Sequence, residues 1–593
     1  QSLELTPDSG IAPLVAMRPS VRLWNARTLD PILPDDGAAD GSASLRPLRI
    51  VAPRNGVGSA QVVLSADQRL KGIRATASEF RQASGATIKA EAVLVRFATR
   101  ESKEMNFTAP YFDALLETPG IATTVQPIWL TVRVPAGAIP GEYSGELKVE
   151  ASGAEFKVPV HLAVAAWKIP APRDWHTFTS FLQSPESVAW QYGVPIWSEQ
   201  HFRLLGQSFG FMGELGGRTL TVPVLDQTHL WTEHAMIPLR RTAEGFVPEF
   251  GLFDRYLDLY QQHVGEPTRL VLYVWDMELN TIEAGRADEI VLTEILPDGK
   301  LIPVTLPIYG EPASRALWLS IMEGVRQRVK QRGWDERCVT IGVASDGRPD
   351  RQTVNFFKGI APYAQWSIFT HGRGDPRPKN RRLILNGGMS VGWEELVKVS
   401  DRDQSEYQPG SRARDAGLAD WNDPENRYGF LLTWSTRFYM FEYSDPEMWR
   451  AMADAVVQPG IAGFSRYGLD YWPVRRPGEN SVERVLVNDE WNLDNPRSIL
   501  APGPTGAVGT VRFEMLREGL QEAEARIALE LAAQRGALPP ATAEQFNRLQ
   551  ADRRHFRSFG ASGNRWTIGP MAQEQGAALY ALAAQIEGGA ATK

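Results

Sequence analysis

The spacing of apolar residues changes near residue 172 of this 593-residue chain, and the change constrains the fold more than any single motif does. Upstream of it, short runs of alternating apolar and polar residues are separated by Gly, Pro and Asn. The clearest of these runs are 59–66, 88–97, 127–135, 141–151 and 155–167. Alternation with a period of two is typical of half-buried strands, and turn residues at this spacing are typical of a β-sandwich. We therefore predict an all-β sandwich domain over residues 1–172.

Beyond Pro170 and Pro172, short apolar runs alternate with stretches of helical period. We expect strands at 178–182, 218–224, 269–276, 339–346, 365–371, 382–388, 428–435 and 461–472. We expect helices at 253–263, 317–333, 353–362 and 446–457. A (β/α)8 barrel of the TIM type is the simplest fold for such a succession, and we predict that it forms the catalytic domain over residues 173–500.

Two further segments complete the predicted architecture. Residues 280–312 are too many for a simple loop, so we expect an insertion on the top face of the barrel. Residues 501–593 have helical periodicity and begin with a long helix that we expect to be amphipathic, followed by helices that pack on the barrel. The predicted fold class is α+β multidomain: an N-terminal β-sandwich, a (β/α)8 TIM-like barrel and a C-terminal helical segment.

Charge and motif content exclude several classes of partner and chemistry. The net charge is −7 and no block of five or six basic residues occurs, so we expect neither nucleic acid nor an anionic membrane as a partner. No run of 18 apolar residues predicts a membrane span. The eight His are scattered, and the sequence contains no HExxH, calcium-loop, GxSxG or phosphate-loop motif. We therefore expect no metal and no other cofactor.

The single cysteine and the first residue bear on the cellular compartment. Cys338 has no partner for an internal disulfide, so cysteine usage does not indicate a compartment, and we expect a buried, apolar role for it. The chain begins with Gln1 rather than Met, and we expect a periplasmic or extracellular protein whose signal peptide has been removed. The sequence does not indicate an oligomeric state.

Two segments carry a resemblance to a known family. Residues 461–472 form a glycine-aromatic strand that ends in Tyr-Trp; a Pro-Gly-rich loop and the pattern Arg-x-Glu-x-Leu-Arg-Glu-Gly-Leu follow. This order resembles the C-terminal part of the family-123 glycoside hydrolases, the β-N-acetylgalactosaminidase-like enzymes, and residues 134–164 resemble the sandwich domain that precedes their catalytic domain. The residues that match the last pattern are Arg512, Glu514, Leu516, Arg517, Glu518, Gly519 and Leu520.

The resemblance implies a reaction, and one position departs from it. Family-123 enzymes carry an Asp-Glu pair after a barrel strand: the Asp orients the 2-acetamido group of the substrate, and the Glu is the general acid and base. Asp346 matches the Asp, but Gly347 occupies the position of the Glu. Loss of a general acid costs on the order of 10²–10⁴ in rate, so we expect another carboxyl in its place and an activity that differs from unchanged β-N-acetylgalactosaminidase activity.

Asp276 and Glu278 are the candidates for the missing acid. They end one predicted strand, and Asp346 ends the next predicted strand along the chain. Neighbouring strands of a sheet lie about 4.8 Å apart. Asp346 would then be base, nucleophile or acetamido-orienting group, and Asp276 or Glu278 the acid. The sequence does not give the distance between the two carboxyls, so a retaining and an inverting reaction both remain open. The alternative is that these acids cap the following segments or, for Asp346, form an ordinary Ser-Asp-Gly turn.

Aromatic and polar residues near the predicted strand ends are candidates for sugar binding, because aromatic rings stack on pyranose faces. The alternative for each ring is packing beneath the loops. The candidates are Trp275, Arg348, His371, Asn386, Trp393, Trp434, Arg437, Tyr467, Asp470, Tyr471 and Trp472.

The sequence thus favours a glycosidase that hydrolyses O-glycosidic bonds of a glycan or oligosaccharide with carboxylate acid and base groups in a barrel cleft. A non-catalytic glycan-binding protein derived from such a hydrolase is the alternative, and a structural surface protein is a third possibility. The sugar, the linkage and exo or endo action stay open.

Overall fold

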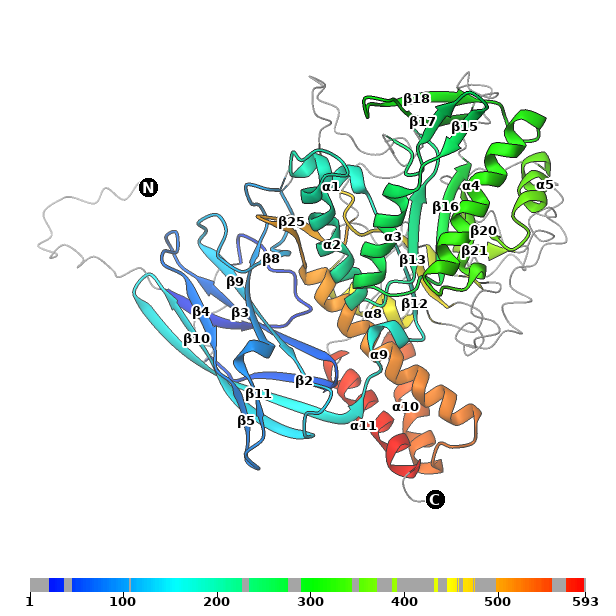
Figure 1. Cartoon of the computed structure of the whole chain (residues 1–593). Helices are drawn as coiled ribbons and strands as arrows, with labels where there is room; N and C mark the ends of the chain where they lie inside the picture. The colour runs from blue at the N-terminus through cyan, green and yellow to red at the C-terminus, as the bar shows by residue number, and fades with distance from the viewer. Residues whose placement is uncertain are drawn as a thin grey trace, which may run out of the picture.

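A computed structural model describes most of the chain (Figure 1). The described residues are 21–36, 45–105, 108–226, 234–275, 290–343, 351–370, 387–391, 431–432, 434–435, 445–455, 457, 462–472, 474, 498–556 and 572–590. A sheet-rich N-terminal part lies beside a mixed α/β part, and the C-terminal helices run along both (Figure 1). None of the described helices is long and apolar enough to cross a membrane.

Two sheets build the N-terminal part around a shared apolar core. One has the order β1 (Arg22–Ala26), β3 (Val57–Ser65), β9 (Val125–Arg133), β7 (Val93–Thr99) and β8 (Ala114–Leu116). The other has the order β2 (Leu48–Arg54), β11 (Ala154–Lys168), β10 (Gly141–Ala151), β5 (Phe80–Gln82) and β6 (Thr87–Ile88), and β4 (Arg74–Ala77) also pairs with β10. Apolar residues from both sheets, among them Val62, Leu130 and Leu162, form one buried cluster. The predicted β-sandwich is therefore present.

The β10–β11 hairpin shows why the local prediction succeeds. Ser152 and Gly153 form its two-residue turn with φ angles of 50° and 84°. Two positive φ angles give a turn whose twist matches that of the flanking strands, and glycine adopts such an angle without steric cost. The predicted strands 141–151 and 155–167 are confirmed to within one residue.

The middle of the chain forms parallel strands in two groups. The first group is β12 (Phe178–Leu182), β24 (Gly463–Gly468) and β23 (Trp434–Ser435). The second is β13 (Thr219–Pro223), β16 (Arg269–Trp275), β19 (Val339–Val343) and β20 (Gln365–Thr370), followed by the antiparallel β21 (Gly387–Val391) and β22 (Leu431–Leu432). A parallel bridge between Thr179 and Gly217 connects β12 to the start of β13. Within the described ranges the strands do not close into a single sheet.

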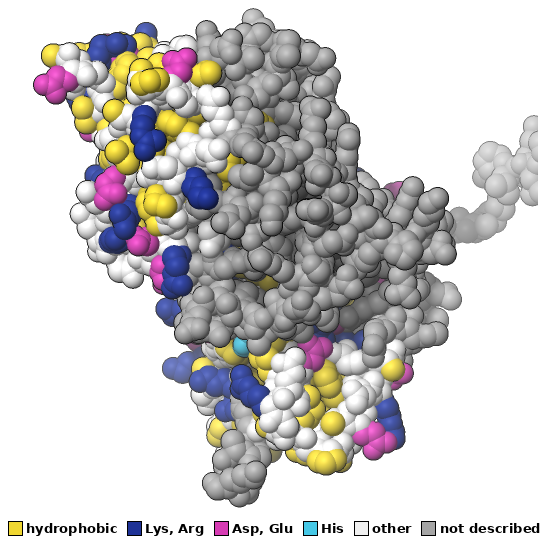
Figure 2. Space-filling view, turned by 90° about the vertical axis from the view of Figure 1, so that its right-hand side faces the viewer, with side chains coloured by type: hydrophobic (Ala, Val, Ile, Leu, Met, Phe, Trp, Pro, Cys, Tyr) yellow, Lys and Arg dark blue, Asp and Glu magenta, His cyan; other side chains and the backbone are white. Residues whose placement is uncertain are grey.

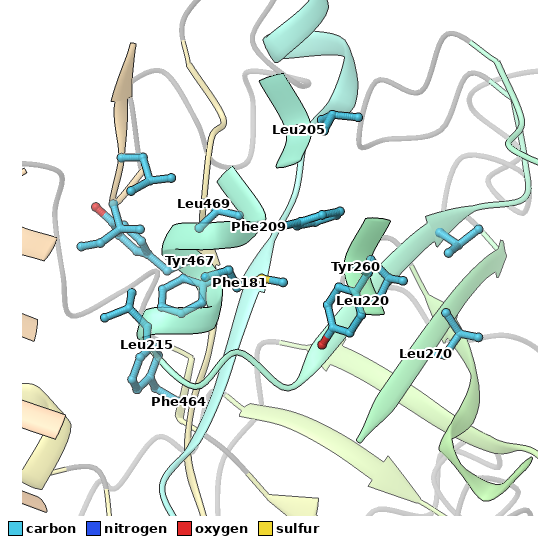
Figure 3. Packing of buried hydrophobic residues seen from close by; sticks show 14 of the residues in the cluster. Phe181, Leu205, Phe209, Leu215, Leu220, Tyr260, Leu270, Phe464, Tyr467 and Leu469 are labelled. Carbon is cyan, nitrogen blue, oxygen red and sulfur yellow. The ribbon is translucent and has the colours of Figure 1, made fainter. Parts of the chain in front are cut away.

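Helices alternate with these strands as expected. The predicted helices are found as α3 (Gly251–His263), α4 (Pro312–Gln331), α5 (Arg351–Ile360) and α8 (Pro446–Ala455). Two further helices, α1 (Pro185–Gln191) and α2 (Glu199–Glu214), were not predicted. Side chains from α2 and α3, such as Phe209 and Tyr260, pack against Phe181, Leu220 and Leu270 of the strands (Figure 3). Cys338 is buried, as predicted. The face shown in Figure 2 carries side chains of both signs on its described parts.

A small additional sheet lies beyond the carboxyl end of β13. It has the order β15 (Gly245–Pro248), β14 (Leu239–Thr242), β17 (Ile290–Ile295) and β18 (Leu301–Leu306). The backbone amide of Asp226, just after β13, donates a 2.9 Å hydrogen bond to Val291 on β17. The predicted insertion at 280–312 therefore includes a β-hairpin, and its partner hairpin at 239–248 was not predicted.

The C-terminal part begins with the hairpin β25 (Ala501–Gly503) and β26 (Gly506–Val508) and continues as α9 (Val511–Gln534), α10 (Pro540–Phe556) and α11 (Ala572–Ala590). The prediction of an amphipathic α9 is wrong, because every residue from Val511 to Ile527 is buried. The helix lies between the sandwich, α8 and α11 (Figure 1), and its charged side chains pair with charges on these neighbours. An interior helix with internal ion pairs has no need of a polar face.

Candidate active site

The carboxyl ends of β24, β12, β13 and β16 meet at one edge of the parallel strands, which is where barrel enzymes place their reacting groups. The described residues that follow these strands include Ser184 after β12, Asp226 after β13 and Asp470 after β24. Trp275 is the last residue of β16. The sheet thus brings four distant segments together at this edge.

Asp470 is the predicted site residue whose environment is best defined. It is 1% exposed, and its Oδ1 accepts a 2.9 Å hydrogen bond from the backbone amide of Ser184. Burial raises the pKa of the Asp470 carboxyl to about 6, and the hydrogen bond from Ser184 opposes this only in part. Oδ2 has no hydrogen-bond partner within the part of the chain that the structure describes.

Glu186 and two tyrosines share the surroundings of Asp470. Glu186 lies in the first turn of α1, where the Ser184 side chain caps the helix by accepting from the Ser187 amide. Burial raises the pKa values of Tyr256 and Tyr471 well above their usual range, and the charges of Asp470 and Glu186 raise them further. Two carboxyls and two phenols, from α1, α3 and the residues that follow β24, therefore lie in one buried region.

The predicted aromatic residues at the end of β24 are covered in this conformation. Tyr471 is 4% exposed and Trp472 is 1% exposed. The indole Nε1 of Trp472 donates a 3.0 Å hydrogen bond to the Leu500 carbonyl, and the ring packs edge-on against Tyr192. Both rings therefore contribute to packing, and stacking on a sugar stays a prediction.

Trp275 and Tyr467 are also buried. Trp275 makes no hydrogen bond through Nε1 to any residue in the described ranges. Tyr467 lies on β24, one residue before the end of the strand. Its ring packs edge-on against Trp449 with the ring centroids 4.7 Å apart, and its hydroxyl accepts a 3.2 Å hydrogen bond from Arg512. Tyr467 thus points toward α9.

The remaining candidates lie outside the described residues. Trp434 belongs to β23, but its side chain is among the undescribed parts. The others are Asp276, Glu278, Asp346, Gly347, Arg348, His371, Asn386, Trp393 and Arg437. Their roles stay predictions.

Sequence reasoning missed Glu186 and Tyr256. Glu186 could have been found, because Ser184-Pro185-Glu186 directly follows a predicted strand and strand ends carry the chemistry of such folds. Tyr256 lies inside a helix, and nothing in its sequence neighbourhood distinguishes it from a core residue.

The described groups suit proton transfer and hydrogen bonding. A carboxyl with a pKa near 6 exchanges its proton close to neutral pH, which a general acid or base requires. Within the described ranges no group of three or more His, Cys, Asp or Glu could hold a metal ion.

Comparison with protein families gives two matches along the chain. Residues 182–528, more than half of the sequence, match the model described as "Glycoside hydrolase 123, catalytic domain". Residues 48–151 match the model described as "Glycoside hydrolase 123 N-terminal domain". The first range includes every described strand end of the candidate site.

Solved structures were also compared. A family 123 glycoside hydrolase from Clostridium perfringens, studied for glycolipid glycan hydrolysis, has a TM-score of 0.66 at 15% sequence identity, and the likeness covers 96% of this chain and 98% of that chain. This likeness shows a shared fold. A proposed α-galactosidase of Bacteroides fragilis has a TM-score of 0.16 at 9% identity over 54% of this chain and 50% of that chain, which carries no argument. A search of curated protein sequences found no match.

Proposed function

The chain belongs to glycoside hydrolase family 123 and is a glycosidase, and from this premise we propose where and how it acts. The proposed reaction is hydrolysis of an O-glycosidic bond of a glycan at the edge where β24, β12, β13, β16 and β19 end. Glycolipid glycans are the first natural substrates to test, because the Clostridium perfringens relative was studied with them.

The pairing of β16 with β19 carries the proposal for the catalytic carboxyls. The two strands are parallel, and Trp275 is opposite Val343 in their register. The chain therefore leaves both strands at neighbouring positions, with Asp276 and Glu278 following one and Asp346 following the other. Neighbouring strands lie about 4.8 Å apart, a spacing from which two carboxyls can reach one sugar.

In the proposed mechanism Asp346 orients the 2-acetamido group of the substrate or acts directly at the anomeric carbon. Asp276 or Glu278 donates a proton to the leaving oxygen, the role that Gly347 cannot perform. Asp470, Tyr471 and Trp472 belong to the sugar-binding surroundings of this site, as do Trp275 and the undescribed candidates. Burial or a neighbouring negative charge would keep the donor protonated near neutral pH.

We further propose that the mixed α/β part is a TIM-like (β/α)8 barrel that covers residues 173–500, between a sandwich of residues 1–172 and a helical segment of residues 501–593. The parallel order β24, β12, β13, β16, β19 and β20 supports the barrel. Export to the periplasm or beyond is part of the proposal, and fractionation of the producing cells tests it.

The test uses purified wild-type protein and the Asp346→Asn variant with a panel of aryl glycosides and glycolipid-derived oligosaccharides. NMR of the first product formed gives the anomeric configuration and separates retention from inversion. We expect cleavage by the wild type and a loss on the order of 10²–10⁴ in the variant. Near-normal cleavage by a folded Asp346→Asn protein would remove Asp346 from the mechanism.

A further inference from the structure

Arg512, the first residue of the Arg-x-Glu-x-Leu-Arg pattern, is a buried cation between the sandwich and the parallel strands. Its Nε and Nη2 each lie 2.9 Å from Oδ2 of Asp113, which directly precedes β8 of the sandwich. Both side chains are 4% exposed. The backbone amide of Val511 also donates a 2.8 Å hydrogen bond to the Asp113 carbonyl. We call the Asp113–Arg512 ion pair the interdomain bridge.

The guanidinium of Arg512 also contacts residues on and beside β24. Nη1 of Arg512 donates to the Ser498 carbonyl at 2.8 Å and to the Tyr467 hydroxyl at 3.2 Å. A buried guanidinium is stable only when charged and polar partners surround it. The ion pair with Asp113 therefore orients the guanidinium of Arg512, and with it the hydrogen bonds to Ser498 and Tyr467.

Residues 498–500 in turn hold the end of β24. Ser498 forms a parallel bridge with Gly468, and the amides of Ile499 and Leu500 donate to Gly468 and Leu469 at 3.0 and 3.2 Å. The Leu500 carbonyl accepts the indole hydrogen bond of Trp472. The segment after Ser498 thus extends the β24 edge along residues 468–472.

The other side of this strand end is held by β12. The Leu469 amide donates a 2.7 Å hydrogen bond to the Leu182 carbonyl, and Asp470 accepts from Ser184. The turn with Asp470 therefore lies between two supports: β12, which belongs to the same sheet, and residues 498–500. Arg512 of the interdomain bridge holds the Ser498 carbonyl, and the Thr510 hydroxyl donates a 2.7 Å hydrogen bond to the Ile499 carbonyl.

We propose that Asp113 of the sandwich is a positioning residue for the active site, acting through Arg512 and residues 498–500 on the turn that carries Asp470. The sandwich is then part of the catalytic unit, although it supplies no reacting group. The inference rests on the proposed function for the location of the reaction, while the coupling between Asp113 and the β24 end can be tested without a substrate.

The test compares Asp113→Asn with Gln521→Met in the full chain. Asp113→Asn keeps the shape of the side chain and removes its charge. Gln521 makes a different contact between the sandwich and α9: its Oε1 accepts from the Val57 amide at 2.6 Å and its Nε2 donates to the Val57 carbonyl at 2.8 Å. Among the described residues both of these hydrogen bonds lead to Val57 and neither leads to β24, so Gln521→Met loosens the same interface without touching the interdomain bridge.

Hydrogen exchange measured by mass spectrometry gives the readout that needs no substrate. We expect amide exchange in peptides covering 462–472 and 498–503 to become at least about fivefold faster in Asp113→Asn, whereas Gln521→Met accelerates exchange around Val57 only. With an aryl glycoside that the wild type cleaves, Asp113→Asn should lower kcat/KM roughly tenfold, because a displaced sugar-binding turn orients the substrate less well. Gln521→Met should stay within about twofold.

Each outcome decides the proposal. Equal exchange at 462–472 in both variants overturns the coupling, and faster exchange with an unchanged kcat/KM overturns the role in the reaction. If the wild type cleaves no substrate, the exchange data still decide the coupling, and the proposed function fails separately. If Asp113→Asn does not fold, Tyr467→Phe removes only the hydroxyl that accepts from Arg512, and faster exchange at 462–472 is expected there as well.

Discussion

The backbone amide of Ser184 donates a hydrogen bond to Oδ1 of Asp470 across 286 residues of sequence, and it joins the ends of β12 and β24. The contact fixes one oxygen of a carboxyl that is otherwise surrounded by buried side chains. Its consequences for stability can be measured.

Asp470→Asn should stabilise the protein at high pH. The folded pKa of about 6 lies above the ordinary value of 3.8, so the folded state binds the proton more tightly than the unfolded state. The stability that this proton contributes is complete below about pH 4 and is lost as pH rises through 6. A difference of about two pKa units corresponds to about 3 kcal/mol. The asparagine side chain keeps an oxygen that can accept the hydrogen bond of the Ser184 amide, and it cannot ionise.

Thermal unfolding at pH 4.5, 6 and 8 tests this expectation. The advantage of Asp470→Asn over the wild type should grow across the series. Asp258→Asn is the control, because Asp258 is exposed and pairs with Arg332 at the surface. A pH-independent difference would show that Asp470 is not the buried acid described above.

Asp276→Asn and Glu278→Gln should separate the two candidates for the acid. The variant that has lost the proton donor should lose on the order of 10²–10⁴ in kcat/KM on natural oligosaccharides, whose leaving group needs a proton. It should lose much less on an aryl glycoside with a good leaving group such as p-nitrophenol. Equal losses on both kinds of substrate would indicate a binding role for that residue.

Gly519→Ala should destabilise the protein, although alanine has a higher helix propensity than glycine. A Cβ at Gly519 would lie 2.1 Å from the backbone oxygen of Arg450, so α8 and α9 would have to separate. Overpacking of this kind costs about 1–3 kcal/mol or more, whereas Gly to Ala in a free helix gains about 1 kcal/mol. Gly210→Ala on α2 is the matched control, because its Cβ meets nothing closer than 3.8 Å. Chemical denaturation of both variants gives the comparison, and a stable Gly519→Ala protein would contradict it.

Glu514→Gln should destabilise the protein at neutral pH and less so in acid. Burial alone would raise the pKa of the Glu514 carboxyl, but the charges of Arg517 and Arg96 outweigh it and hold this pKa at about 2. Because the folded pKa lies below the ordinary 4.5, the contribution is present above pH 4.5 and is lost as pH falls toward 2. The shift corresponds to about 3 kcal/mol.

Denaturation at pH 7 and pH 3 measures this difference. The effect of Glu514→Gln should be clearly smaller at pH 3. Glu544→Gln removes an exposed partner of Arg548 and should have little effect at either pH. A loss of equal size at both pH values would assign the effect of Glu514→Gln to packing.

The Arg-x-Glu-x-Leu-Arg-Glu-Gly-Leu pattern illustrates how far the sequence leads. Residue by residue it indicated the family, and family models match most of the chain. Its physical meaning appears only in the structure: Arg512 pairs with Asp113, Glu514 pairs with Arg96, and Gly519 allows α8 to approach α9. All three partners are distant in sequence, so no local pattern could reveal them.

Local periodicity by itself determined most of the described strands of the two parts, four of the helices, and the switch from sandwich to alternating elements. These features depend on contacts between near neighbours, which the sequence states directly. Only the tertiary structure decided that α9 is buried on all sides, that Trp472 is covered, and that Glu186 and Tyr256 lie near Asp470. Burial and pKa depend on which distant segments exclude water from a side chain, and that is a property of the packed chain.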